Sequence, residues 1–418
     1  MTTAPGAGRA ASALGALRAN RNFRLLWIGQ ILSDLGTQIG TLAYPLLVLA
    51  LTHSALLAGV VGTAAEASAF AVRLPAGALA DRLDRRRAMM LTDGVRTVAL
   101  AALAVLVATG SVSWPVVMVV AVVDRVGDTL FTPSSIAALP LLVEDEHLEA
   151  GWAVSEGRQY AANLVGPPLG GLLYGLGRAI PFLADAISYG ISVLTSRAIT
   201  GDFGTKSEHT KRRSLWSESL DGLKLLWHDA FLRAVLIQAP LINFAFSGAI
   251  FTVILGLRRN GVSAVVIGGA EAVIMVGGIV GAVLAPQIRA RLSVRQALLL
   301  LAGGGAILFF VAAAIMPSPA IAIPLALPLV LSPATNAALF AIVLRRAPAS
   351  MHGRVNAGLF QVAGALAALA PLVGGLVVNE ASAGWAMVLF AAALALAVPV
   401  AFIFPLPPED GPPEDAAD

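Results

Sequence analysis

Apolar runs that are long enough to cross a lipid bilayer recur along almost the whole sequence, with short polar turns between them. An α-helix needs about 20 apolar residues to span the hydrocarbon core of a membrane. The chain is 57% hydrophobic and only 13% charged, and a water-soluble fold of 418 residues could not bury that much apolar surface. The sequence therefore predicts an all-α polytopic membrane protein with twelve transmembrane helices. The predicted spans are 23–51, 55–80, 88–109, 116–139, 150–174, 179–200, 231–257, 262–288, 296–316, 320–344, 355–378 and 385–404.

Basic residues are concentrated in alternate turns, and this distribution predicts the orientation of the spans. Several arginines precede the first span, and others follow the second, eighth and tenth spans. Basic residues in short loops are retained in the cytoplasm, so we expect both termini there and the chain in a bacterial cytoplasmic (inner) membrane. The expected parts are a cytoplasmic tail (1–22), an N-terminal six-helix half (23–200), a cytoplasmic linker (201–230), a C-terminal six-helix half (231–404) and a disordered acidic tail (405–418).

A sequence repeat relates the two predicted halves. Residues 77–81 align with residues 281–285 at the same offset that places residues 167–171 on residues 371–375. Matches in the same order at one offset indicate parallel halves related by an axis along the membrane normal. We therefore expect two pseudo-symmetric halves of six helices each.

The turn between the second and third spans carries the spacing G-x-x-x-D-R-x-x-R-R. This pattern resembles the signature loop of the major facilitator superfamily, whose members are twelve-helix transporters. The resemblance implies that the loop is a conformational latch, which contacts helix ends and holds one of two alternating states. A loop that only fixes the orientation of the spans is the alternative. The latch residues would be Gly77, Asp81, Arg82, Arg85 and Arg86, with Asp84 where the family usually has glycine.

Span five contains the pattern Gly-Pro-Pro-Leu-Gly-Gly at residues 166–171. It resembles the G-P-x-x-G-G antiporter motif of drug-exporting facilitators. Proline removes a backbone donor and glycines let helices approach closely, so we expect a bend at a helix interface. The motif favours export over import. Residues 220–227 and 353–356 make the chain similar to the macrolide and siderophore exporters. Its key residues are Gly166, Pro167, Gly170 and Gly171.

Charged side chains lie inside several spans, mostly in the first half. Each costs about 2.5–3.5 kcal/mol to place in a membrane, so each needs a functional or structural reason. A carboxyl group that faces a water-accessible cavity can alternate between protonated and charged forms, as a proton-coupled carrier requires. Asp34 is the first candidate, because no basic residue lies one turn away on its helix. The other candidates are Glu66, Asp124, Asp128 and Glu156.

Some of these charged residues have an equally simple structural interpretation. Asp124 and Asp128 lie one helical turn apart, which suits either a titrating pair or a neutralised structural cluster. Asp93 and Arg96 have i,i+3 spacing, which favours a structural pair near the cytoplasmic end of span three. Asp185 lies close to the outer end of span six, and we expect it at the membrane interface.

Polar and aromatic residues on the predicted spans are candidates for substrate contact, although helix packing is the simpler explanation for each. An apolar cavity with a few carboxylates would suit an amphipathic organic molecule. The candidates are Tyr44, Tyr160, Asn163, Asn243, Phe244, Glu271, Phe360 and Gln361.

No pattern in the sequence indicates enzymatic chemistry. The H-E-x-x-H, Walker and G-x-S-x-G motifs are absent, the five histidines lack ligand spacing, and there are no cysteines. We therefore expect no cofactor, no metal site and no nucleic-acid partner.

The sequence and its resemblance predict a secondary active transporter that works as a monomer by alternating access. Its expected activity is proton-coupled efflux of small amphipathic compounds, such as drugs or siderophores, with protons as the coupling ion. One alternative is a facilitator that imports a small nutrient. Another is a non-transporting membrane sensor or scaffold, which would be marked by a large folded appendage.

Overall fold

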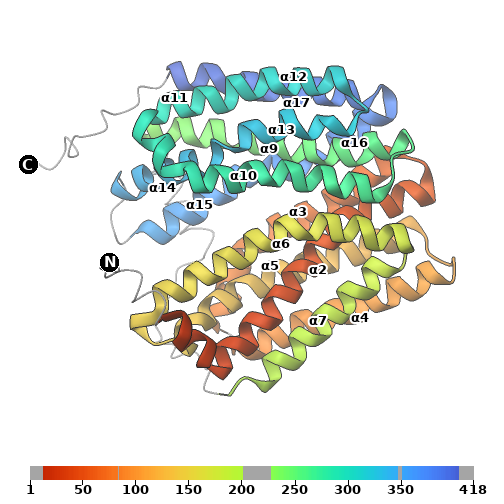
Figure 1. The fold of residues 1–418 in the computed structure, drawn as a ribbon, viewed down its shortest axis with the longest axis vertical. Coiled ribbons are helices and arrows are strands. Elements are labelled where there is room, and N and C mark those ends of the chain that lie inside the picture. The colour runs from red at the N-terminus through yellow and green to blue at the C-terminus, as the bar shows by residue number, and fades with distance from the viewer. Residues whose placement is uncertain (1–12, 83, 201–226, 347–350, 404–418) are drawn as a thin grey trace, which may run out of the picture. The chain divides into compact units, whose positions relative to one another are not determined.

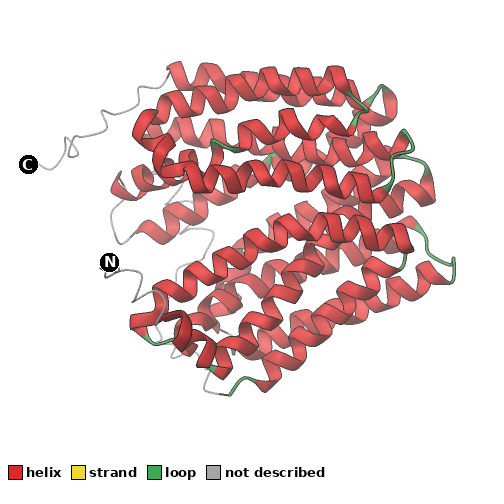
Figure 2. Ribbon diagram, viewed as in Figure 1, coloured by secondary structure: helices red, strands yellow, loops and turns green. Residues whose placement is uncertain are grey.

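The structure, a computed structural model, describes residues 13–82, 84–200, 227–346 and 351–403. Within these ranges the regular secondary structure is entirely helical (Figure 2). Most of the predicted linker and the predicted acidic tail lie outside the described residues.

Six long helices follow one another in the first half of the chain (Figure 1). The shortest has 19 residues, which at about 1.5 Å per residue extends close to 30 Å and can cross a bilayer core. They are α2 (Arg21–Thr52), α3 (Ala55–Arg82), α4 (Arg85–Ala108), α5 (Trp114–Leu142), α6 (Leu148–Leu176) and α7 (Ile180–Ala198), with the short helix η1 (Asp145–His147) between α5 and α6.

The second half contains three unbroken long helices and three spans that are built from shorter helices. The unbroken helices are α9 (Ala230–Arg259), α10 (Ala264–Arg291) and α17 (Ala383–Ile403). Span nine consists of α11 (Val294–Leu299), η2 (Leu300–Gly304) and α12 (Gly305–Ile315). Span ten consists of η3 (Pro319–Ile321), α13 (Ala322–Leu329) and α14 (Ser332–Arg346). Span eleven consists of α15 (His352–Ala365), η5 (Ala367–Leu369) and α16 (Ala370–Glu380).

Each of the twelve predicted spans is thus occupied by one helix or by helices that follow directly on one another. Among the described residues, nine spans are also long and apolar enough to cross a membrane by composition. The other three helices, α5, α6 and α7, do not meet this criterion of length and apolar composition. Together with α2 and α4, they contribute the buried polar groups of the candidate site.

The described residues form two compact units. The first unit consists of Met1–Leu51 and Ala64–Lys211, and the second of Thr52–Thr63 and Arg212–Asp418, as far as these ranges are described. The division falls inside α3, whose first turns pack with the second unit. The predicted boundaries at the linker remain predictions.

The first turns of α3 approach α16 closely at Gly59. A Cβ atom at Gly59 would overlap with the backbone around Pro371 and Leu372. The N–H of Leu372 donates to Thr63 Oγ1 at 2.9 Å. Since glycine lets helix backbones approach, Gly59 and the facing Gly375 permit this contact.

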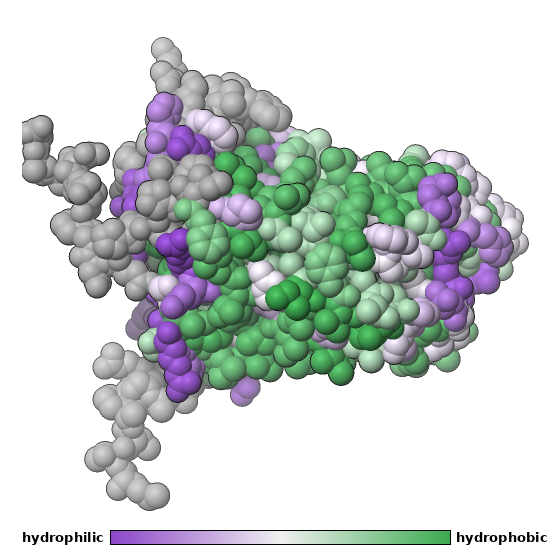
Figure 3. Space-filling view, turned by 90° about the horizontal axis from the view of Figure 1, so that it is seen from above, coloured by the Kyte–Doolittle hydropathy of each residue, from purple (hydrophilic) through white to green (hydrophobic). Residues whose placement is uncertain are grey.

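The surface of the second unit around α11, α12 and α17 has the polarity that a bilayer requires. Figure 3 shows a broad band of hydrophobic side chains, with hydrophilic side chains gathered at its two ends. Ile307, Phe310 and Leu396 are among the exposed apolar side chains of these helices. Apolar side chains that would be unfavourable in water are stable against lipid tails.

Candidate functional site

The polar residues of α7 lie on one buried face. Asp185, Ser188, Tyr189, Ser192 and Ser196 follow one another at helical spacing, and all are buried. Residues three or four positions apart share one side of a helix. α7 lies beside α4 along much of its length (Figure 1). The polar face of α7 is therefore turned into the first unit, away from lipid.

Arg96 of α4 is the centre of this polar region and has 0% of its surface exposed. Its Nε donates to Asp124 Oδ1 of α5 at 2.9 Å, and its Nη1 donates to Asp93 Oδ1 at 3.2 Å. Its Nη2 donates to Thr37 Oγ1 of α2 at 2.9 Å and also to the hydroxyl of Tyr189. One guanidinium group therefore joins α2, α4, α5 and α7.

Asp124 receives further hydrogen bonds from two tyrosines. The hydroxyl of Tyr44 donates to its Oδ2 at 3.1 Å, and that of Tyr189 to its Oδ1 at 3.2 Å. One turn along α5, Gly127 leaves room for the aliphatic part of Arg96, since a Cβ there would lie 2.6 Å from Arg96 Cδ. The predicted cavity residue Tyr44 is thus a partner of a carboxylate.

A second ionic group surrounds Arg125 of α5. Its Nε lies 3.0 Å from Glu66 Oε1 of α3, and its Nη1 lies 3.2 Å from Asp128 Oδ2. The three side chains are between 27% and 36% exposed. Asp124 and Asp128 therefore have different arginine partners, although they lie one turn apart.

Asp34 forms an ion pair with Arg158 of α6. The two side chains differ in environment, because that of Asp34 is 27% exposed whereas that of Arg158 is 5% exposed. No other ion pair involves Arg158 among the described residues. Asp34 lies near the middle of α2, so this pair connects two helices deep inside the first unit.

Asp185, which was expected near the outer end of span six, is buried among the helices of the first unit. Only 1% of the surface of Asp185 is exposed. A Cβ at Gly36 of α2 would overlap with its carboxyl group, and one at Gly40 would lie 3.6 Å from Oδ2. Ser188 Oγ donates to Oδ1 at 3.4 Å, whereas Oδ2 has no hydrogen-bond partner among the described residues. The glycines of α2 let that helix close over Asp185.

The buried region has more carboxyl groups than cations. We call Arg96, Asp93, Asp124 and Asp185 the Arg96 cluster; all four are at most 6% exposed. Asp93 and Asp124 both bond to Arg96, and Asp185 lies within electrostatic range of Arg96 and Asp124. The Asp93–Arg96 pair, which spacing alone assigned to a structural role, is part of this larger group.

The glycines of the span-five motif pack against α2. A Cβ at Gly166 would overlap with the side chain of Gln38, and one at Gly170 would lie 3.0 Å from the carbonyl oxygen of Ile39. All four motif residues are buried. The motif thus forms a close α2–α6 contact, and α6 also carries Arg158.

The structure describes only part of the predicted latch. Asp81 and Arg82 end α3, and their side chains fall outside the described residues. Gly77 has open space where a side chain would begin.

The remainder of the predicted latch opens α4. Arg85 is the first residue of the helix, and Arg86 donates to the backbone carbonyl of Arg197 at the end of α7. Asp84 caps α4, because its Oδ1 accepts a hydrogen bond from the N–H of Arg87 at 2.8 Å. The aspartate that replaces the family's glycine therefore has a local structural function.

Three of the predicted substrate residues lie on α9 and α10 of the second unit; Glu271 is buried, whereas Asn243 is exposed. Glu271 of α10 is 5% exposed, and among the described residues no ion pair involves it. The Phe244 ring packs edge-on against Phe390 with centroids 5.2 Å apart. Asn243 Nδ2 donates to the carbonyl of Ala363 at 3.0 Å, which joins α9 to α15.

The remaining candidates differ in exposure. Glu156, Tyr160 and Phe360 are exposed, Asn163 is half-buried and Gln361 is buried. Exposed aromatic residues are available for substrate or lipid contact, whereas the buried glutamine contributes to packing.

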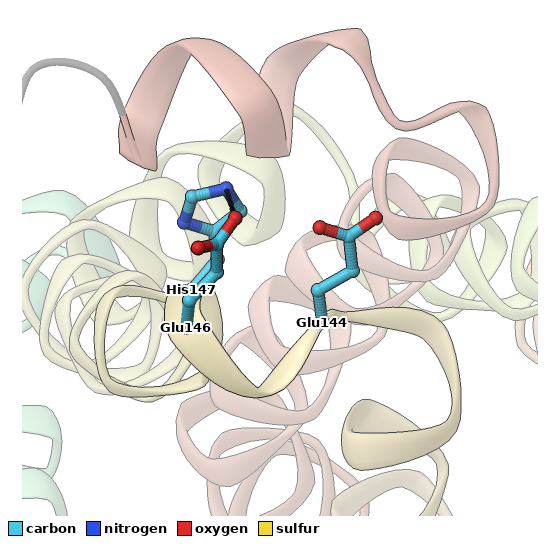
Figure 4. A group of neighbouring side chains, drawn as sticks. All are labelled: Glu144, Glu146 and His147. Atoms are coloured by element: carbon cyan, nitrogen blue, oxygen red, sulfur yellow. Dashed lines mark ion pairs between the residues drawn. The ribbon is translucent and has the colours of Figure 1, made fainter.

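Three side chains at the turn between α5 and α6 lie close together (Figure 4). His147 Nε2 lies 3.3 Å from Glu146 Oε1, and Glu144 is nearby. Both glutamates are exposed, and hydrated carboxylates at a surface turn are common without an ion. We assign no function to this group.

Sequence reasoning did not find the Arg96 cluster as a unit. Asp185, Thr37 and Tyr189 were not singled out as its members. Two signals in the sequence point to it: the polar residues of α7 recur at helical spacing, and glycines recur on α2 at positions 29, 36 and 40, facing α7. A polar stripe on one helix and a glycine stripe on another indicate a close polar contact.

Sequence comparison identifies the family and one group of relatives. The model of the Major Facilitator Superfamily matches residues 26–369. The multidrug efflux pump Tap of Mycobacterium tuberculosis is 28% identical over 219 residues, which cover 50% of this chain and 52% of the pump. Tap of Mycolicibacterium fortuitum is 28% identical over 221 residues, covering 51% and 54%. The match thus spans about half the length of these relatives.

Solved transporter structures share the fold at low sequence identity. The nucleoside transporter NupG aligns with a TM-score of 0.69 at 13% identity, covering 92% of this chain and 98% of that chain. A bacterial homologue of the iron transporter ferroportin, in an inward-facing state, aligns with a TM-score of 0.69 at 17% identity, covering 91% and 97%. The predicted twelve-helix fold is confirmed. Twelve helical spans and a family match over most of the sequence lead to one conclusion: the chain belongs to the major facilitator superfamily.

Proposed function

We propose that this transporter exports small amphipathic organic compounds across the bacterial inner membrane in exchange for protons, by alternating access. The observation that carries the proposal is the Asp34–Arg158 ion pair, which joins a partly exposed carboxylate to a buried arginine. A proton can reach such a carboxylate, whereas a buried arginine needs a counter-charge.

Protonation of Asp34 would remove the negative partner of Arg158. The energetic cost of leaving the buried guanidinium unpaired then favours a rearrangement of α2 against α6. Deprotonation restores the pair. A ligand that binds one of the two arrangements more tightly is thereby linked to proton release.

Two observations support export as the direction. The first is that the Tap efflux pumps are similar in sequence to this chain over half of its length. The second is that the span-five motif, which is typical of exporters, forms the α2–α6 contact through Gly166 and Gly170. We assign substrate contact to the exposed aromatic residues Tyr160 and Phe360, because stacking surfaces suit amphipathic molecules. We assign the latch function to Arg85 and Arg86, which lie at the start of α4.

The test is substrate-induced proton movement in inverted membrane vesicles with a preformed acid interior. A panel of lipophilic drugs and siderophores is added to vesicles that contain the wild-type protein, Asp34→Asn or Glu146→Gln. Glu146 is an exposed residue of the α5–α6 turn and serves as the matched control. We expect some compounds to dissipate the gradient with the wild type and the control, but not with Asp34→Asn.

Other outcomes contradict parts of this proposal. Equal responses of wild type and Asp34→Asn would remove Asp34 from the coupling step and leave Glu66, Asp128 or Glu156 for it. Proton-driven uptake of a nutrient into intact cells would favour import. A protein that moves no compound in either direction would favour the sensor or scaffold interpretation.

A further inference from the structure

We propose that Asp185 of α7 is a proton-binding residue of this transporter, and that its neutral form is the one over which α2 closes. The proposal rests on the proposed proton coupling and specifies a residue for it that spacing in the sequence did not indicate. Three observations carry it: the charge balance of the Arg96 cluster, the bonding of its carboxyl groups, and the glycine contact with α2.

The charge balance requires a proton in the Arg96 cluster. Three carboxyl groups and one guanidinium group share a region in which every member is at most 6% exposed. If all were ionised, the cluster would hold two uncompensated negative charges. Isolated buried charges are so unfavourable that the group neutralises instead, by binding a proton.

The bonding pattern shows where that proton belongs. Asp124 accepts from Arg96 at 2.9 Å and Asp93 accepts from it at 3.2 Å, so both are stabilised as carboxylates. Among the described residues Asp185 has no such bond to a cation; its carboxyl group accepts a long hydrogen bond, 3.4 Å, from Ser188, and its other hydrogen-bonding neighbour is the neutral hydroxyl of Tyr189, both on the same helix. Asp185 is therefore the carboxyl group of the cluster that gains least from being charged.

The groups that face Asp185 come from each neighbouring helix. α4 contributes Arg96 and Asp93, and α5 contributes Asp124. The negative charge of Asp124 disfavours ionisation of Asp185. Two phenols face the same region, Tyr44 on α2 and Tyr189 on α7 itself. On α6, the charged residue Arg158 forms its ion pair with Asp34.

The contact with α2 links the protonation state of Asp185 to the packing of α2 against α7. Gly36 and Gly40 bring the α2 backbone directly against the carboxyl group, whose Oδ2 is buried. A carboxylate in this position would have neither a direct hydrogen bond to a cation nor hydration. Loss of the proton therefore favours separation of α2 from α7, which admits water to Asp185. Because α2 also carries Asp34, the two carboxyl groups would respond to the same helix movement.

Infrared spectroscopy of the full chain in lipid vesicles tests this without a transport substrate. A protonated carboxyl group has a carbonyl stretching band that is separate from the bands of a carboxylate, and the band shifts in D₂O. At neutral pH we expect the band to be weaker in Asp185→Asn than in the wild type and unchanged in Asp34→Asn; the part that remains in Asp185→Asn is assigned to Glu271, which is also buried without an ion pair among the described residues. Asp185→Glu should restore a band at a shifted frequency, which shows that the site and not only the fold is intact.

Two results would overturn the proposal. One is a band of equal intensity in the wild type and in folded Asp185→Asn. The other is an Asp185 band that neither shifts in D₂O nor disappears at alkaline pH, because a proton that never exchanges cannot couple transport. Neither result depends on drug-driven proton movement in vesicles, so failure of the export proposal and failure of this one are distinguishable.

Discussion

Substitution of Gly127 by alanine tests the geometry of the Arg96 cluster most directly. The new Cβ would lie 2.6 Å from Arg96 Cδ and 2.7 Å from Cγ, whereas carbon atoms in contact prefer about 3.5–4.0 Å. Arg96 must therefore move by about 1 Å. Its bond to Asp124, now 2.9 Å long, would then exceed hydrogen-bonding distance.

The expected cost follows from the bond that is lost. A hydrogen bond to a charged group contributes about 1.5–3 kcal/mol, and an alanine in a helix gains about 0.5–1 kcal/mol over glycine. Gly94→Ala is the matched control, because Gly94 lies on α4, two residues from Arg96, with no atom within 4 Å of its Cβ position. Both variants gain the same helix preference. The difference in unfolding free energy between them should therefore be about 1.5–3 kcal/mol, the value of the bond itself.

The assay is reversible unfolding by sodium dodecyl sulfate in mixed micelles, followed by circular dichroism. We expect Gly94→Ala to be at least as stable as the wild type and Gly127→Ala to be clearly less stable. If the two variants unfold at the same denaturant fraction, Arg96 is not held against α5 as described, and the charge-balance argument for Asp185 loses its basis.

Three further substitutions test other contacts. Gly248→Ala should cost about 1–3 kcal/mol in the same unfolding assay, because the methyl group would overlap with the fully buried ring of Phe390. Asp84→Ala should lower stability by about 1 kcal/mol through loss of the N-cap bond to Arg87, whereas Asp84→Asn should retain most of it. Gly170→Leu should abolish drug-driven proton movement in vesicles while the protein still inserts into the membrane, since the side chain would separate α6 from the α2 backbone; unchanged transport would contradict a functional α2–α6 contact.

Most of the fold could be predicted from the sequence because a bilayer allows few solutions. An apolar run of about 20 residues must form a helix, as its backbone groups have no water to bond. For this reason the twelve spans were recognisable, including the three that contain internal breaks. The breaks themselves, such as η2 within span nine, were not predicted, because short departures from regular helix geometry depend on packing with neighbours.

The candidate site was only partly predictable. The ionisable residues within spans could be found one by one, since each is costly in lipid. Their partners could not be found, because helix rotation decides which groups meet. Asp124 and Asp128 illustrate this: one turn apart on α5, they pair with Arg96 and Arg125 respectively. The burial of Asp185 was not predicted, because position along a span does not show which face of the helix is turned inward.

The uneven distribution of buried charge has an electrical consequence. The Arg96 cluster and the Asp34–Arg158 pair lie in the first unit, whereas Glu271 is the one buried ionisable side chain among the described residues of the second. A transmembrane voltage does work on charge alone, about 2.3 kcal/mol per elementary charge and 100 mV. The voltage therefore acts mainly on α2, α4, α5, α6 and α7, and hardly on the helices of the second unit. A proton bound to these helices adds a charge on which the cell's voltage, as well as its pH difference, can exert force.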